Sequence, residues 1–180
     1  PRLMDGHPMG SGCGTANVIN FNSCELYQTG FNDTAFIAFS GGGTSNQRFF
    51  TGKVSFKDTL ISQQEYYGDS PIFSMPYYTS GSATTTVSIE SSEIKAKTSE
   101  QSIGDFDSRF VTVNIGDGSV IDGALSVGES KIILGTSVKY RSADRQSVKL
   151  TSGISGDISG KFAGIYHESS AAEYDEQSGY

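Results

Sequence analysis

The 180-residue chain lacks tryptophan altogether, has only four prolines, two cysteines and two histidines, and only 18% of its residues are charged. Few prolines beside 22 glycines favour many short strands joined by tight turns. No apolar run approaches the roughly 20 residues that a membrane-spanning helix needs, so the sequence predicts no transmembrane segment.

The scarcity of histidine also bears on catalysis. Neither a G-x-S-x-G nucleophile turn nor a phosphate-binding loop occurs, and His7 lies in an N-terminal stretch that we do not expect to be native throughout. His167 is then the single base available to a Ser-His-Asp arrangement. We expect that the chain is not an enzyme. The paired carboxylates of a hydrolase are an exception to this reasoning, because they can come from any two positions in a sequence and form no motif.

The charge balance excludes other classes of partner. The net charge is −7, the pI is about 4.7, and the 13 lysines and arginines are scattered along the chain. Nucleic acid and anionic lipid both need clustered basic residues, so neither is an expected partner.

Cys13 and Cys24 are separated by ten residues rich in Gly, Asn and Thr. Two cysteines in such a loop-like segment predict a local disulfide, and with it an oxidising compartment. Such a small ring would contribute about 2–3 kcal/mol at most. A lipid-anchored Cys13 fits less well, because Met9-Gly-Ser-Gly12 lacks the apolar residue expected three positions before such a cysteine.

The N-terminus does not show the order of charged, apolar and small residues that is typical of a signal peptide. Because the chain begins with Pro1, we interpret residues 1–12 as partly a remnant of expression. Any signal or anchor is expected to be absent from this sequence.

A triple glycine in Ser40–Ser45 interrupts all regular patterns, and we place a domain boundary there: residues 1–45 as a short N-terminal segment and residues 46–180 as the main domain. From Arg48 onwards, apolar residues recur at every second position, as on half-buried strands with one wet face. Turn residues separate these runs, for instance at Gly116-Asp-Gly118. The expected faces are Phe50, Gly52, Val54 and Phe56; Ala83, Thr85, Val87 and Ile89; Ile94 and Ala96; Val111, Val113 and Ile115; Ile121, Gly123, Leu125 and Val127; Ile132, Leu134, Thr136, Val138 and Tyr140; and Ile158, Gly160, Phe162 and Gly164.

This spacing predicts an all-β fold of about eight or nine antiparallel strands, either an up-and-down β-barrel or a sandwich. Glycines on the presumed inward face favour the small barrel, where strands bend sharply. Closure of a barrel also removes exposed sheet edges.

Three blocks in the expected order carry a family resemblance. They are Met75-Pro76 with Ser80–Thr86, Phe106–Leu125, and Gly160-Lys-Phe-Ala-Gly164 followed by Ala171-Ala172-Glu173. Together they resemble the C-terminal β-barrel of the bacterial transferrin-binding protein B and factor H-binding protein type. The chain departs from that pattern in a longer turn, Ile165–Ser170, and in Asp175–Ser178, which replaces the usual pair of glycines.

The resemblance implies an eight-stranded barrel over residues 46–180 and a reduced handle-like subdomain over residues 1–45. It also implies a secreted or surface-exposed bacterial protein, similar to surface lipoproteins, that works with an outer-membrane receptor or a secretion partner. The expected function is capture of haem or a host iron-carrying protein. The alternative on the same barrel is host interaction, through a complement regulator or by adhesion, and a purely structural surface module is a third class.

Two segments supply candidate contact residues. The connector Glu65–Tyr78 has no alternation and is rich in aromatic side chains, which suit an interface because they bring large contact areas at low entropic cost. The same rings could instead fold back and cap the barrel. In the lengthened turn, His167 is a candidate ligand for haem iron, with a tyrosine or Met75 as second axial ligand. The expected contact residues are Tyr66, Tyr67, Phe73, Met75, Tyr77, Tyr78, Tyr166 and His167.

Overall fold

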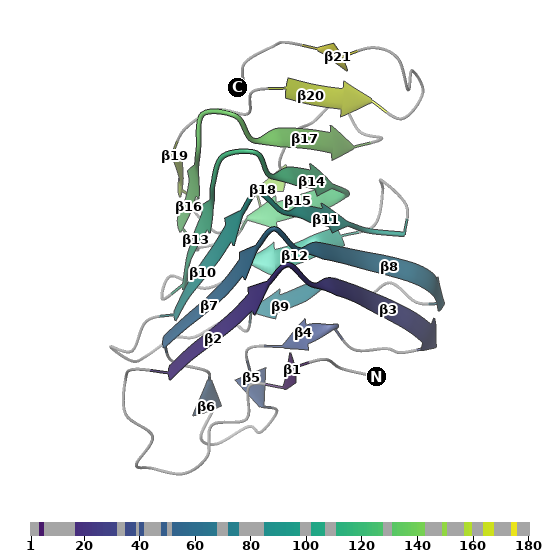
Figure 1. Cartoon of the computed structure of the whole chain (residues 1–180), viewed down its shortest axis with the longest axis vertical. Helices are drawn as coiled ribbons and strands as arrows, with labels where there is room; N and C mark the ends of the chain where they lie inside the picture. Colours follow the sequence, from purple (N-terminus) through teal and green to yellow (C-terminus); the bar gives the residue numbers. More distant parts are fainter. Residues whose placement is uncertain are drawn as a thin grey trace.

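The computed structural model describes residues 4–5, 17–31, 35–38, 40–41, 48–49, 52–67, 72–75, 85–97, 102–106, 111–127, 131–142, 149–150, 157–159, 164–167 and 174–175. Within these ranges every regular element is a strand, and the strands form three long sheets and one short pair. Successive strands enter sheets B, C and A in turn, so the chain coils instead of folding back on itself (Figure 1).

Sheet B contains six strands, and every neighbouring pair in it is parallel. In spatial order they are β2 (Asn17–Asn22), β7 (Gly52–Lys57), β10 (Thr85–Glu90), β13 (Val111–Ile115), β16 (Lys131–Leu134) and β19 (Asp157–Ser159).

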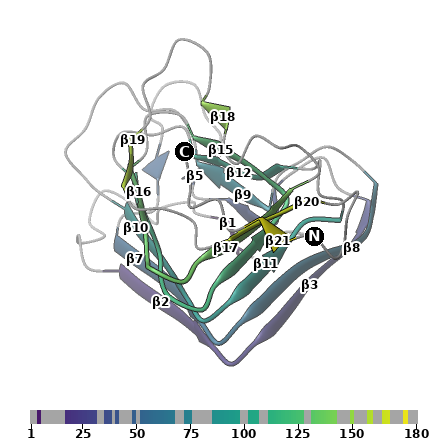
Figure 2. The same cartoon turned by 90° about the horizontal axis from the view of Figure 1, so that it is seen from above.

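Sheet C lies beside sheet B and meets it at a sharp corner (Figure 2). It is parallel except for its last strand, which pairs antiparallel with β20. Its strands are β3 (Glu25–Phe31), β8 (Leu60–Tyr67), β11 (Glu93–Lys95), β14 (Val120–Asp122), β17 (Lys139–Ser142), β20 (Gly164–His167) and β21 (Tyr174–Asp175).

Sheet A is the third side, and all of its pairs are parallel. It contains β1 (Met4–Asp5), β4 (Ile37–Ala38), β9 (Phe73–Met75), β12 (Ser102–Phe106), β15 (Ala124–Val127) and β18 (Lys149–Leu150). A separate antiparallel pair joins β5 (Ser40–Gly41) to β6 (Arg48–Phe49). The architecture is a three-sided parallel β-helix (Figures 1 and 2).

The core runs along the inside of this coil as stacks of like side chains, one from each turn. In sheet B, Val54, Val87, Val113 and Ile132 lie in register, and each has 0% exposure. Beside them Phe21 stacks on Phe56 with ring centroids 5.1 Å apart. Each fully buried Val, Ile or Phe contributes about 1.5–3 kcal/mol relative to an exposed one, so the stacks hold successive turns together.

The predicted antiparallel up-and-down β-barrel is wrong, because sheets A and B are wholly parallel and the strands do not close into a barrel. The inward positions were correct for Val54, Phe56, Val87, Ile89, Ile94, Ala96, Val113, Ile115, Ile132, Leu134, Val138 and Tyr140. Alternation has the same period of two in parallel and antiparallel strands, so it identifies faces without identifying neighbours. Turn residues are equally ambiguous. In this fold they bend the chain into the next sheet, whereas in a hairpin they would reverse its direction.

The run from Ile132 to Tyr140 shows the difference. The sequence predicts one strand, whereas the structure places a corner at Gly135–Val138 between β16 and β17. Thr136, expected on the inward face, is exposed at that corner.

The proposed boundary at residue 45 lies among residues that the structure does not describe. On its two sides, β2 pairs with β7 and β3 pairs with β8, so the strands before and after it share sheets B and C.

Candidate binding surface

The corner between sheets B and C is built by a repeated polar residue. In the first three turns only two residues separate the strands, and the first of each pair has a positive φ: Ser23 (52°), Asp58 (50°) and Ser91 (48°). Aspartate adopts this left-handed conformation more readily than apolar residues do, and serine occupies the same position in the other two turns. The single left-handed residue turns the chain from one sheet into the next.

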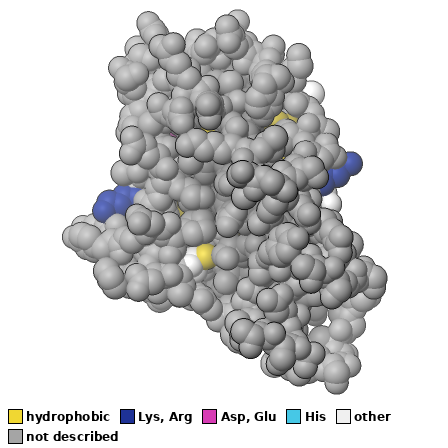
Figure 3. Space-filling model, turned by 180° about the vertical axis from the view of Figure 1, so that it is seen from behind, with side chains coloured by type: hydrophobic (Ala, Val, Ile, Leu, Met, Phe, Trp, Pro, Cys, Tyr) yellow, Lys and Arg dark blue, Asp and Glu magenta, His cyan; other side chains and the backbone are white. Residues whose placement is uncertain are grey.

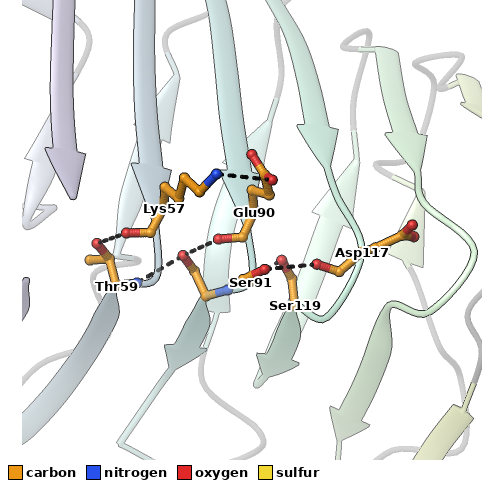
Figure 4. Close-up of polar contacts among 7 residues, drawn as sticks. Lys57, Thr59, Glu90, Ser91, Asp117 and Ser119 are labelled. Atoms are coloured by element: carbon orange, nitrogen blue, oxygen red, sulfur yellow. Dashed lines mark hydrogen bonds and ion pairs between the residues drawn. The ribbon is translucent and has the colours of Figure 1, made fainter. Parts of the chain in front are cut away.

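The second residue of each pair forms a ladder along the corner (Figure 4). The Thr59 amide donates to Ser92 Oγ (3.0 Å), and the Ser92 amide donates to Ser119 Oγ (3.4 Å). The Thr59 and Ser92 hydroxyls also donate to carbonyls two residues back, Thr59 to Lys57 (2.9 Å) and Ser92 to Glu90 (2.7 Å). The ladder thereby locks the register of neighbouring turns at this corner.

Cys24 occupies the first position of the same ladder. Its amide donates to Thr59 Oγ1 (3.4 Å) and its thiol donates to the Asn22 carbonyl (3.3 Å), as the hydroxyls do in later turns. The structure has Cys24 as a half-buried free thiol, and Cys13 lies outside the described residues. The Cys13–Cys24 disulfide therefore stays a prediction, and alkylation without reductant tests it.

Because the corner fixes the register, the outward face of sheet B carries two ordered rows of side chains, which we call the sheet B face. The first row consists of Val18, Lys53, Thr86, Thr112 and Lys131, and the second of Asn20, Ser55, Ser88, Asn114 and Ile133. Neighbouring strands are about 4.8 Å apart, so similar hydroxyl and amide groups recur at that interval along the coil. The Ser55 hydroxyl donates to Asn20 Oδ1 (2.5 Å), which couples two members of the second row.

The sheet B face has more lysines than acids, although the whole chain is acidic. Its two rows hold Lys53 and Lys131, with Asp157 of β19 opposite Lys131, and the next outward position of β7 and β10 adds Lys57 and Glu90, which lie opposite each other. Lys57 Nζ lies 3.4 Å from Glu90 Oε1, and both side chains are more than half exposed, so this ion pair contributes about 0–1 kcal/mol. The face differs in sign from the net charge of −7.

Lysine side chains of the described part project at both margins of the molecule when it is seen from behind (Figure 3).

Sequence reasoning missed this surface, although a signal for it is present. The triplets Lys53-Val-Ser55, Thr86-Val-Ser88 and Thr112-Val-Asn114 share a central inward valine between two outward polar residues. The turns have different lengths, so the triplets do not recur at a fixed interval. Residues that are hydrogen-bonded between neighbouring turns are 35, 33, 27 or 19 positions apart in the sequence. A search for a fixed repeat length therefore passes over them.

The aromatic connector predicted over Glu65–Tyr78 is partly strand. Tyr66 and Tyr67 end β8, where they pair with Gly30 and Phe31 of β3. Phe73 lies in the core with 0% exposure and meets Phe56 edge-on at 5.8 Å. Met75 ends β9, and Tyr77 and Tyr78 lie outside the described residues.

The residues proposed for haem lie at the far end of the coil. Tyr166 and His167 belong to β20, where they pair with Arg141 and Ser142 of β17. Their side chains are not among those described, so haem ligation by His167 stays a prediction. Within the described ranges no group of three or more His, Cys, Asp or Glu could hold a metal ion.

No family model matches the chain, and neither a curated protein nor a solved structure matches it. In the part of the chain that is described, no helix has the length and apolar character to cross a membrane. The interpretation of the sheet B face therefore depends on the residues of that face alone.

Proposed function

We propose that this chain is an exported, non-enzymatic binding module of the host-interaction or adhesion type, and that its sheet B face binds an extended acidic polysaccharide. The observation that carries the proposal is the pair of in-register rows of hydroxyl and amide side chains, with lysines among them.

The chemistry of the rows favours a sugar polymer. Thr86, Thr112, Ser88 and Asn114 offer donors and acceptors at regular intervals, which match the hydroxyl groups of a repeating ligand. Such a polymer would lie across the strands along the coil, meeting a similar group at each step of about 4.8 Å. A ligand made of one small unit would use only one or two of these steps.

The charge of the face favours an acidic polymer. Lys53 and Lys57 are exposed on it, and opposite charges steer encounter and fix orientation. Because exposed charges are screened by salt, binding should weaken as ionic strength rises. The acidic remainder of the chain would repel the same ligand and confine it to this face.

Titration calorimetry with chondroitin sulfate oligosaccharides tests the proposal. Lys53→Ser should weaken binding by about two- to fivefold, the worth of one exposed charge pair. The double variant Thr86→Val/Thr112→Val keeps the shape, removes two hydroxyls and should weaken binding further.

Lys95→Ser is the matched control, because Lys95 is an exposed lysine on sheet C. It should leave binding unchanged. No binding by the unaltered chain, or an equal loss with Lys95→Ser and Lys53→Ser, would contradict the proposal.

A further inference from the structure

Most lysines of the sheet B face have an acid beside them on the neighbouring strand. Lys57 forms its ion pair with Glu90 of the next strand (Figure 4). Lys131 lies opposite Asp157 of β19. Opposite charges at neighbouring positions largely cancel for a ligand that approaches both, so neither pair gives the face much net charge.

Lys53 is the exception among the outward lysines of the described part of sheet B. Its neighbours on the two adjacent strands are Val18 of β2 and Thr86 of β10, so no acid lies at either position. The Lys53 side chain is exposed, and a ligand can reach it. The uncompensated positive charge of the face is therefore concentrated at one end, over β2 and β7.

An exposed amide lies near this lysine. Asn20 is two residues along β2 from Val18, and its Oδ1 accepts the hydrogen bond from the Ser55 hydroxyl. The acceptor of the amide is thus used within the face, while its Nδ2 group keeps two donors for a ligand. The acidic group of a sugar only accepts hydrogen bonds, and an ammonium with an amide donor beside it suits such a group.

The middle of the face is suited to neutral sugars. In the two rows, β10 and β13 present Thr86, Ser88, Thr112 and Asn114, which are uncharged and half-buried. A second acid of the ligand would find no cation there, and the opposed Lys131 and Asp157 beyond these strands add little net charge. From β7 to β19 the face extends over four strand steps, about 19 Å.

We propose that the polysaccharide is mainly neutral and that the face recognises a single acidic sugar, bound by Lys53 and Asn20, while neutral sugars extend over β10 and β13. This depends on the function proposed above, since the face and the ligand are the same. A densely charged polymer would bring its further acids towards Glu90 and Asp157, so these acids should add little to its affinity.

Titration calorimetry with three forms of a chondroitin octasaccharide tests the single acid site. The first form is sulfated, the second is desulfated and keeps its carboxylates, and the third is desulfated with its carboxylates reduced to alcohols. One of the two removals should lower the affinity by about two- to fivefold and the other by less than about twofold, because one exposed charge pair is lost. The step at which the loss occurs shows whether the bound acid is a sulfate or a carboxylate. In Lys53→Ser all three forms should bind equally.

Asn20→Asp is the sharper variant, because it places a carboxylate beside Lys53 without changing the shape of the side chain. It should reverse the preference, so that the uncharged octasaccharide binds most tightly. Since Asn20 is exposed, the variant should keep the circular dichroism of the unaltered chain.

Lys57→Ser and Lys131→Ser are the comparison variants, because each removes a lysine of the same sheet that has an acid opposite it. Whatever their overall affinity, both should retain the difference between the charged and uncharged octasaccharides. Similar losses at both removals, or the same loss of discrimination in Lys131→Ser as in Lys53→Ser, would overturn the single acid site and leave the proposed function intact. No binding of any of the three forms would contradict the proposed function, and the acid site with it.

Discussion

At the scale of single residues, Asp117 joins two turns at the B–C corner. Its Oδ1 accepts hydrogen bonds from the amides of Thr136 (2.6 Å) and Ser137 (3.2 Å) and from the Thr136 hydroxyl (3.1 Å). These donors, the Thr136 amide foremost, hold the pKa of Asp117 below its ordinary value. A β-carbon on Gly135 would come within 2.8 Å of the Asp117 amide nitrogen, so glycine is required beside this carboxylate.

We expect Asp117 to stabilise the fold in a manner that depends on pH. A folded pKa below the unfolded one means that the stabilisation is present above the ordinary value of 3.8 and is lost as pH falls through the folded pKa. Thermal unfolding of the unaltered chain and of Asp117→Asn at pH 7 and at decreasing acid pH measures this. Their melting temperatures should differ at pH 7 and converge in acid.

Gly135→Ala is the companion variant, because its methyl group would displace the same carboxylate. It should lower the melting temperature at pH 7 and flatten the acid dependence. A gap between Asp117→Asn and the unaltered chain that is constant with pH would refute this role.

At the scale of elements, the corner ladder explains how turns with different connecting lengths stay in register. Cys24, Thr59, Ser92 and Ser119 present similar groups from four successive turns, while partner positions are separated by 35, 33 or 27 residues. The corner itself has two residues in the first three of these turns and four, Gly116–Ser119, in the fourth, so it differs by only two residues while the separations differ by up to eight.

Ser92→Ala should destabilise the chain by about 1–3 kcal/mol, because it leaves the buried Thr59 amide without its acceptor. Chemical denaturation measures the change in free energy of unfolding. Cys24→Ser is the control, since a hydroxyl preserves the bond to the Asn22 carbonyl, and its effect should be small. Equal effects of the two substitutions would show that the ladder is not what aligns the turns.

At the scale of the whole molecule, the sequence predicted the residues that face the core and missed how the strands are connected. Val54, Val87 and Val113 were expected inside and are buried. Their mutual stacking depends on contacts between turns, which no local pattern encodes. Since polar-Val-polar triplets are also ordinary in antiparallel strands, the sheet B face could not be deduced before the register was known.

Spin labels at cysteines introduced in pairs test the parallel register. In a background of Cys13→Ser/Cys24→Ser, labels at Lys53 with Thr86 and at Lys57 with Glu90 should show equal, strong dipolar broadening, since both pairs are directly opposite. Labels at Lys53 with Glu90 should show weaker broadening, because four residues of strand separate them by about 13 Å. An antiparallel pairing would give the reverse order and contradict the coil.

Because the turns stack in register, the coil can be shortened or lengthened only by whole turns. Thr85 pairs with Gly52 on one side and with Val111 on the other, so removing residues 85–110 would bring Gly52 opposite Val111. Val54 would then meet Val113 and Phe56 would meet Ile115, again apolar against apolar. We therefore expect the chain to fold with one turn fewer, about 4.8 Å of coil, and the length of the proposed polysaccharide that it covers to shrink by the same step.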